Sequence, residues 1–248
     1  MSTPDSEPDC LLCHDIHWVY PRKPDGTPDY SQVERCQCVK EQDEKDRQES
    51  LLKYCGLPEM TEHKTLDKFL TFGDKPLKEA LADSLKVAAA AEDIIFLTLI
   101  GKSDTGKSHL AIGICREWLE RKRAARYANV PRMLNELREG YKRDGEESFY
   151  YRLNFYCTVG LLALDDFGTE KISEWGAEQL QTIINSRYDD ALHTVVTSNR
   201  QLNDLFNFGD YPRETWRDFA NMRIESRLQR EKWCKVVVLD TVSFMERS

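Results

Sequence analysis

An eight-residue glycine-rich segment near the middle of the chain constrains the fold more than any other feature of the sequence. The segment Gly101-Lys-Ser-Asp-Thr-Gly-Lys-Ser108 fits the pattern G-x-x-x-x-G-K-[ST]. The apolar run at 94–100 predicts a buried strand before it, and residues 108–123 predict a helix after it. A loop in this position can direct successive backbone N–H groups, together with the helix N-terminus, at phosphate oxygens. The pattern therefore predicts a nucleotide-binding α/β fold.

The residue types in this loop also suggest how each would be used. The Lys107 ammonium is expected to reach the β- and γ-phosphates of a nucleoside triphosphate, and the Ser108 hydroxyl to complete a Mg²⁺ shell. The alternative is a glycine-rich turn with a surface lysine, which the flanking strand and helix disfavour. The residues expected to contact the nucleotide are Gly101, Lys102, Ser103, Asp104, Thr105, Gly106, Lys107, Ser108 and His109.

Further polar side chains follow two apolar strands later in the chain. Residues 159–164 predict a strand that ends in Asp165 and Asp166, and residues 193–197 predict another that leads into Asn199. We expect Asp165 to hold Mg²⁺, directly or through water, and Asp166 to polarise the attacking water. Asn199 would orient that water against the γ-phosphate. Taken alone, the aspartates could cap a strand–loop junction and Asn199 could be a turn residue.

Short apolar strands alternate with helical segments through most of the chain. Strands are expected at 94–100, 125–130, 159–164, 193–197 and 235–239. Helices are expected at 77–91, 108–123, 146–156, 173–190 and 215–231, with one more starting at Pro131. This alternation predicts a parallel sheet with helices on both faces.

Four of the eight cysteines form two close pairs near the N-terminus. They are Cys10, Cys13, Cys36 and Cys38. Four thiolates can close a tetrahedral zinc shell, and so short a segment has little core, so metal would decide whether it folds. His14 or His17 could replace one ligand, and four independent reduced thiols are the remaining alternative.

The acidity of the chain is concentrated at its N-terminal end. The net charge is −8, and residues 1–50 hold six bases and twelve acids. That balance argues against this part wrapping a nucleic acid. Residues 40–50 are almost all charged or amide residues and predict a solvated helix or a linker. We therefore expect a zinc-binding domain at 1–45, a linker at 46–60 and a nucleotide-binding domain at 61–248.

Neither a membrane span nor a secretory signal is expected. The longest strongly apolar run covers residues 94–100, whereas a span needs ~20 residues. The N-terminus lacks the basic start and apolar stretch of a signal peptide. We expect a cytoplasmic protein without a membrane partner, in a compartment that keeps thiols reduced.

The order of these motifs resembles that of AAA+ ATPases and, more narrowly, the DnaC/DnaI/IstB group of bacterial helicase loaders and transposition ATPases. Lys107-Ser-His-Leu-Ala111 resembles the group's GK[ST]HLA, and Leu162-Ala-Leu-Asp-Asp-Phe-Gly168 resembles its carboxylate motif. Thr65-Leu-Asp-Lys-Phe69 is similar to the group's TFxxF segment, which lies near the adenine. The resemblance extends over about residues 55–240.

The resemblance implies roles that the motifs alone do not. Arg227 stands where the group has an arginine finger that acts across a subunit boundary, which implies a nucleotide-dependent homo-oligomer or a partner ATPase. Arg138 and Tyr141 share a helix face and resemble a basic–aromatic pair that contacts single-stranded DNA. A solvated arginine and a packed tyrosine fit the sequence equally well. Zinc-bearing N-terminal domains occur in the DnaI-like branch and in many phage-type relatives, where they serve helicase docking, so the resemblance implies the same role here.

Three departures from the group's pattern bear on activity. Asp104 stands where the group usually has glycine, so its carboxylate must point away from the phosphates if affinity is to be kept. Asp166 stands where many AAA+ proteins have glutamate, which predicts slow hydrolysis. The C-terminal segment lacks the arginine that often follows the last strand, and Arg247 is the remaining candidate for a sensor-2 residue.

Taken together, the resemblance implies an ATPase that loads a hexameric replicative helicase onto single-stranded DNA, with ATP, Mg²⁺ and Zn²⁺ as cofactors. Two other functions stay open: IstB-like assistance to DNA transposition, and a nucleotide-binding adaptor with little turnover. The cysteine-rich segment favours the loader.

Overall fold

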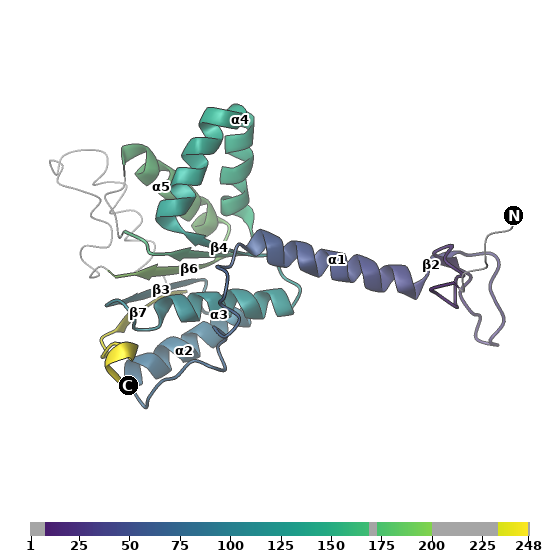
Figure 1. Ribbon diagram of the computed structural model, residues 1–248, viewed down its shortest axis with the longest axis horizontal. Helices are drawn as coiled ribbons and strands as arrows, with labels where there is room; N and C mark the ends of the chain where they lie inside the picture. Colours follow the sequence, from purple (N-terminus) through teal and green to yellow (C-terminus); the bar gives the residue numbers. More distant parts are fainter. Residues whose placement is uncertain (1–7, 169–172, 200–232, 248) are drawn as a thin grey trace, which may run out of the picture. The chain divides into compact units, whose positions relative to one another are not determined.

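The computed structural model describes residues 8–168, 173–199 and 233–247, with only the backbone described at 141–146. The chain divides into two compact units, Met1–Ser50 and Leu51–Ser248 (Figure 1). We refer to the described residues 8–50 as the cysteine module, and to the second unit as the nucleotide unit. No helix in the described part of the chain has the length and apolar character of a membrane span.

The cysteine module has very little regular structure. Strand β1 (Trp18–Val19) pairs antiparallel with β2 (Glu34–Arg35), and α1 (Gln37–Cys55) starts two residues later. The polar stretch at 40–50 is therefore helical, one of the two forms the sequence allowed. Only Cys13 and Cys36 are buried among residues 8–50. This module lacks an apolar core.

The nucleotide unit is built on a five-stranded parallel sheet with the strand order β4-β5-β6-β3-β7. The strands are β3 (Phe96–Gly101), β4 (Ala125–Asn129), β5 (Leu161–Asp165), β6 (His193–Ser198) and β7 (Cys234–Leu239). The register sets Asn129 opposite Asp165 and Ile100 opposite Ser198. The carboxyl ends of the strands therefore meet at one edge of the sheet, as the sequence predicts.

Helices cover both faces of this sheet (Figure 1). Helices α2 (Lys75–Ala88) and α3 (Lys107–Glu120) pack on one face, and α4 (Val130–Thr158) and α5 (Glu174–Asp189) pack on the other. Along β5, Leu161 and Ala163 face the first pair of helices, while Leu162 and Leu164 face the second. The predicted α/β architecture is confirmed. The predicted helix at 215–231 lies outside the described residues.

Helix α4 reverses direction along its length. A Cβ placed on Gly140 would lie 3.3 Å from the Arg152 guanidinium, although twelve residues separate two points of a straight helix by ~18 Å. Figure 1 shows the two resulting arms beside each other. The sequence predicted two helices here, and the chain joins them as one element. Both arms bury apolar residues in one core cluster, among them Leu137 and Leu153.

A fully buried arginine ties the base of α4 to the sheet. The Arg187 side chain on α5 is 0% exposed. Its guanidinium donates to the Thr194 hydroxyl at 2.9 Å. It also donates to the backbone carbonyls of Tyr156, Cys157, Val159 and His193. Burial lowers the pKa of Arg187 to about 9. Among the described residues, the partners of the guanidinium are thus backbone carbonyls and one hydroxyl, without a carboxylate.

Replacing Arg187 by methionine should destabilise the nucleotide unit by about 3 kcal/mol or more, since several buried carbonyls would lose their donor. The measurement is the free energy of unfolding in urea. Arg132→Met, which removes a mostly exposed arginine of α4, is the control and should change stability by less than about 0.5 kcal/mol. Equal effects of the two substitutions would contradict the structural role of Arg187.

Candidate ATP site

The phosphate loop joins the end of β3 to the start of α3 and depends on glycine at two positions. Gly106, immediately before α3, has φ +91°. A Cβ there would lie 2.6 Å from Cε2 of Phe69, and a Cβ at Gly101 would lie 2.7 Å from the Leu239 carbonyl oxygen. Larger residues would displace the loop from the strands and the aromatic ring that surround it.

Asp104 has a left-handed backbone conformation, with φ +59°, which aspartate can adopt more readily than most residues. Its carboxylate accepts hydrogen bonds from the Ser243 hydroxyl at 2.7 Å and from the Met245 N–H at 2.8 Å. These two bonds are the main reason why the pKa of Asp104 is lowered. The carboxylate is therefore directed at the C-terminal segment, 139 residues away in sequence.

The Lys107 side chain is buried and turns back into the loop. Its ammonium donates to the Lys102 carbonyl oxygen at 2.5 Å and lies 3.4 Å from the Thr105 hydroxyl. Burial lowers the pKa of Lys107, and the nearby carboxylates of Asp165 and Asp166 oppose that shift. Lys102 and Ser103 are exposed along the same loop.

Asp165 is the central acceptor of the site. Its Oδ1 accepts a hydrogen bond from the Ser108 hydroxyl at 3.0 Å and another from the Thr197 hydroxyl, and its Oδ2 accepts one from the Tyr127 hydroxyl. Burial, with the Asp165 charge, raises the pKa of Tyr127, so this phenol remains a donor. The predicted magnesium residues, Ser108 and Asp165, are therefore in direct contact.

Asp166 lies beside this group in a different environment. It has φ +58°, and its carboxylate accepts from the Asn129 amide at 2.8 Å. Burial is the largest cause that raises its pKa, and the Asp165 charge adds to it. Asn199 follows β6 and is exposed. It lies at the same edge of the sheet because β5 and β6 pair in parallel.

The sequence analysis did not identify two residues of the site, Tyr127 and Asn129. They lie two residues apart on β4, so they point to the same side of the strand. The sequence did contain a signal for them: polar residues occupy alternate positions in the strand expected at 125–130, ahead of the strand that ends in the two aspartates. The choice of partner, a phenol for Asp165 and an amide for Asp166, depends on the register of β4 against β5.

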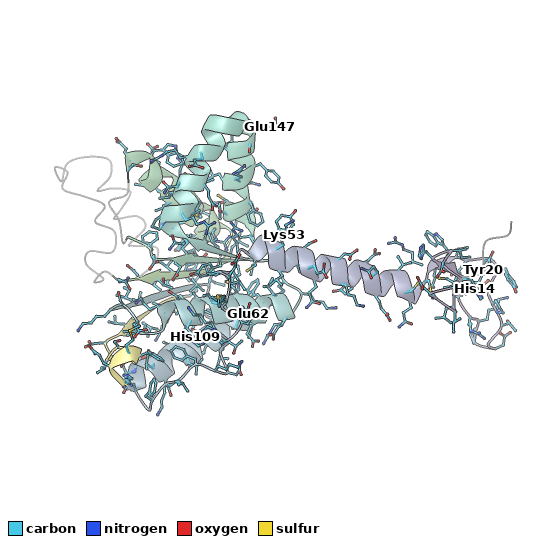
Figure 2. The ribbon with its side chains drawn as sticks, in the orientation of Figure 1. His14, Tyr20, Lys53, Glu62, His109 and Glu147 are labelled. Carbon is cyan, nitrogen blue, oxygen red and sulfur yellow. The ribbon has the colours of Figure 1, made fainter. Side chains whose placement is uncertain are left out.

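An aromatic group borders the loop on the side of α3. The His109 ring on α3 (Figure 2) makes a hydrogen bond with the Thr65 carbonyl oxygen at 2.8 Å. It also contacts the Phe69 ring edge-on, with centroids 5.3 Å apart. Burial lowers the pKa of His109. The Thr65–Phe69 segment, expected near the adenine, thus packs directly on the first turn of α3.

The four N-terminal cysteines come together in the cysteine module. All four Sγ atoms lie within 4.8 Å of one another, with Cys10 and Cys36 at 3.8 Å and Cys13 and Cys38 at 3.6 Å. Tetrahedral zinc with Zn–S bonds of about 2.3 Å needs sulfur atoms ~3.8 Å apart, so the cluster fits zinc. Backbone N–H groups of Cys13 and Leu12 lower the pKa of Cys10 to about 7. None of the chain's eight cysteines forms a disulfide.

His14 and His17 do not belong to this ligand group. His14 lies within the module (Figure 2), and both histidines have positive φ angles, 48° and 67°. The four thiols already supply the four ligands of a tetrahedral zinc site, so no imidazole ligand is needed.

The predicted nucleic-acid residues are only partly described. Arg138 is exposed, donates to the Ser173 hydroxyl at 2.7 Å and lies over the Trp175 ring at 5.2 Å. The side chain of Tyr141 and the whole of Arg227 lie outside the described residues. Arg138 therefore contacts the start of α5 and remains accessible to solvent.

Fold and site together define a P-loop protein of the AAA+ type with an ATP-binding site. The family profile described as IstB-like ATP binding protein matches residues 27–211, and the chain belongs to this family.

Curated relatives include both replication and transposition proteins. The replicative helicase loader DnaI of Bacillus subtilis is 27% identical over 110 residues, 44% of this chain and 34% of the relative. A putative ATP-binding protein of a Mycobacterium tuberculosis insertion sequence is 28% identical over 129 residues, 52% of this chain and 49% of the relative. The matched segments thus span about a third to a half of these relatives.

Solved structures share the fold at low sequence identity. A crystal structure of DnaI matches with a TM-score of 0.60 at 21% identity, covering 76% of this chain and 94% of that one. The replication initiator DnaA bound to AMPPCP and single-stranded DNA matches with a TM-score of 0.61 at 19% identity, covering 75% and 52%.

Proposed function

We propose that the chain hydrolyses ATP and loads a hexameric replicative helicase onto single-stranded DNA. The observation that carries the ATPase part is the direct contact of Ser108 with Asp165, with Lys107 buried in the loop beside them. This arrangement supplies a phosphate-binding ammonium and a hydroxyl–carboxylate pair suited to Mg²⁺. A role in replication would place the protein in the cytoplasm.

Different residues of the site would bind the phosphates, hold Mg²⁺ and activate the attacking water. The loop amides and the Lys107 ammonium would bind the phosphates, while Ser108 and Asp165 would hold Mg²⁺, which supplies charge neutralisation at the phosphates. Asp166 suits the role of a base, because burial raises its pKa and Asn129 fixes its carboxylate. Asn199 and Arg227 remain proposed as the water-orienting residue and the finger of a neighbouring subunit in a homo-oligomer.

The surface of the cysteine module favours the loader. Zinc bound by the four thiolates would fix a module that leaves many large apolar side chains exposed. These are Leu11, Leu12, Ile16, Trp18, Tyr20, Tyr30 and Val33. So much exposed apolar surface on so small a module is typical of a protein-binding site. We propose that it docks the helicase, and that the exposed Arg138, with Tyr141, contacts single-stranded DNA.

The test is capture of the replicative helicase of the same organism by the full zinc-loaded chain, with and without ATP. Helicase should be retained in at least one nucleotide state. Replacing both Leu11 and Leu12 by serine should weaken capture by about tenfold or more, since apolar anchors dominate such interfaces. Leu85→Ser, at an exposed leucine of α2, is the control and should capture as the wild type does. Absence of helicase in both states would refute the loader.

Assistance to transposition is the second candidate, favoured by the relative from an insertion sequence. It predicts a preference for duplex DNA and stimulation of a transposase by the ATP-bound protein. A protein that binds ATP but neither hydrolyses it nor captures a helicase would instead be an adaptor. Binding to the two DNA forms, measured at one stated salt concentration, separates the first two functions.

A further inference from the structure

The last described residues of the chain form hydrogen bonds with one residue of the phosphate loop, Asp104. Three consecutive residues, Ser243, Phe244 and Met245, each donate a hydrogen bond to Asp104. The Ser243 hydroxyl and the Met245 N–H bind its carboxylate, and the Phe244 N–H binds its carbonyl oxygen at 2.9 Å. The loop and the C-terminal turn 241–247, which includes the short helix η2 (Phe244–Arg247), are therefore joined at both the side chain and the backbone of Asp104.

The same turn is held in place from its other side. The Phe244 ring packs on Phe72, with centroids 5.1 Å apart, and on Phe69 at 6.0 Å. The Arg247 guanidinium binds Asp74 and lies over the Phe72 ring at 4.8 Å. Because η2 is anchored to the segment before α2, it holds a fixed position from which its donors can orient the Asp104 carboxylate.

A free carboxylate at position 104 would oppose a triphosphate. Asp104 stands two residues before Gly106, within the loop proposed to bind the phosphates, and its charge would repel theirs if the side chain turned inward. Two donors hold the carboxylate outward at 2.7 and 2.8 Å. Both donors bind the same oxygen, Oδ2, and they can do so only while the C-terminal turn stays docked.

We infer that Asp104 and the C-terminal turn 241–247 form a latch that keeps a negative charge out of the phosphate site and thereby sets the affinity for ATP. The inference rests on the ATP site of the proposed function, not on helicase loading. Asp104 and Ser243 are positioning residues in this latch. Arg247, considered above as a sensor-2 residue, binds Asp74 and so serves the anchoring of the turn.

The test is a double-mutant cycle on the Kd for ATP with Mg²⁺, using the full zinc-loaded chain. Ser243→Ala removes one charge-assisted hydrogen bond and should raise the Kd by about tenfold. Asp104→Gly removes the charge, and glycine accepts the positive φ, so the Kd should equal that of the wild type or fall. In the Asp104→Gly background, Ser243→Ala should have no effect. Ser50→Ala, an exposed serine of the other unit, is the control.

Two outcomes of the cycle would overturn the latch: an unchanged Kd in Ser243→Ala, or the same rise in both backgrounds, which a merely structural role would give. Hydrogen exchange provides a second readout that needs no nucleotide. The Met245 N–H also lies 3.2 Å from the Ser243 hydroxyl oxygen, so the comparison is between Ser243→Ala and the double variant Asp104→Gly/Ser243→Ala. The double variant should exchange the Met245 amide at least tenfold faster while leaving the Phe244 amide, bound to a backbone carbonyl, protected. Equal protection of Met245 in both proteins would also refute the latch. If the exchange result is as expected but the protein does not bind ATP, the proposed ATP site is refuted. The contact between Asp104 and the C-terminal turn is then still supported.

Discussion

Replacing Lys107 by methionine is expected to reduce ATP hydrolysis by about 10²–10³-fold without unfolding the nucleotide unit. Methionine keeps the buried, unbranched stem but removes the only ammonium that the described part of the loop holds inside it, and the loss of one such charge from a phosphate site has effects of this size. The measurement is phosphate release at saturating ATP, with circular dichroism to check the fold. Asp165→Ala should reduce hydrolysis comparably.

Lys53→Ala provides the matched control for charge, because Lys53 is an exposed lysine of α1 (Figure 2). It should hydrolyse ATP at the wild-type rate. Wild-type hydrolysis that survives in Lys107→Met would mean that the loop is not the catalytic phosphate site. No hydrolysis by the wild type, with ATP still bound, would support the adaptor.

Removing zinc is expected to unfold the cysteine module while ATP binding by the nucleotide unit persists. The module buries only Cys13 and Cys36 among residues 8–50, so nothing else described in it can replace the metal as a core. Structural zinc contributes an apparent ~10–16 kcal/mol in small domains of this kind. Limited proteolysis should cleave the module after chelation, and metal analysis should find about one zinc per chain before it.

Cys13→Ser should reproduce chelation, because one of the four sulfur ligands is lost, and helicase capture should be lost with it. Cys234→Ser is the control, since this thiol lies on β7, outside the cluster. It should keep the full zinc content. Purified wild-type protein without stoichiometric zinc would refute the metal site.

The sequence predicted those parts of the site that lie on neighbouring residues or follow from the parallel order of the strands. Strand, glycine-rich loop and helix are adjacent in sequence, so the position of Lys107 followed from short-range preferences. The contact between Ser108 and Asp165 spans 57 residues, yet it was predictable because the carboxyl ends of parallel strands share an edge. The approach of the two cysteine pairs was likewise predictable from their chemistry.

Other contacts depend on tertiary packing that no local pattern encodes. The partners of Asp104 belong to a segment 139 residues away, and only the position of η2 brings them there. The sequence indicated that the Asp104 carboxylate had to point outward, but not which groups would hold it. Tyr127 and Asn129 were missed for a similar reason, since their roles follow from strand register rather than residue type.

The hydrogen bonds of Arg187 have a mechanical consequence for the arms of α4. One guanidinium grips the carbonyls at the end of this helix and the first residues of β6, so sliding the helix end would break several bonds at once. Force applied to α4 near Arg138 would therefore be transmitted to the sheet through the hydrogen bonds of Arg187.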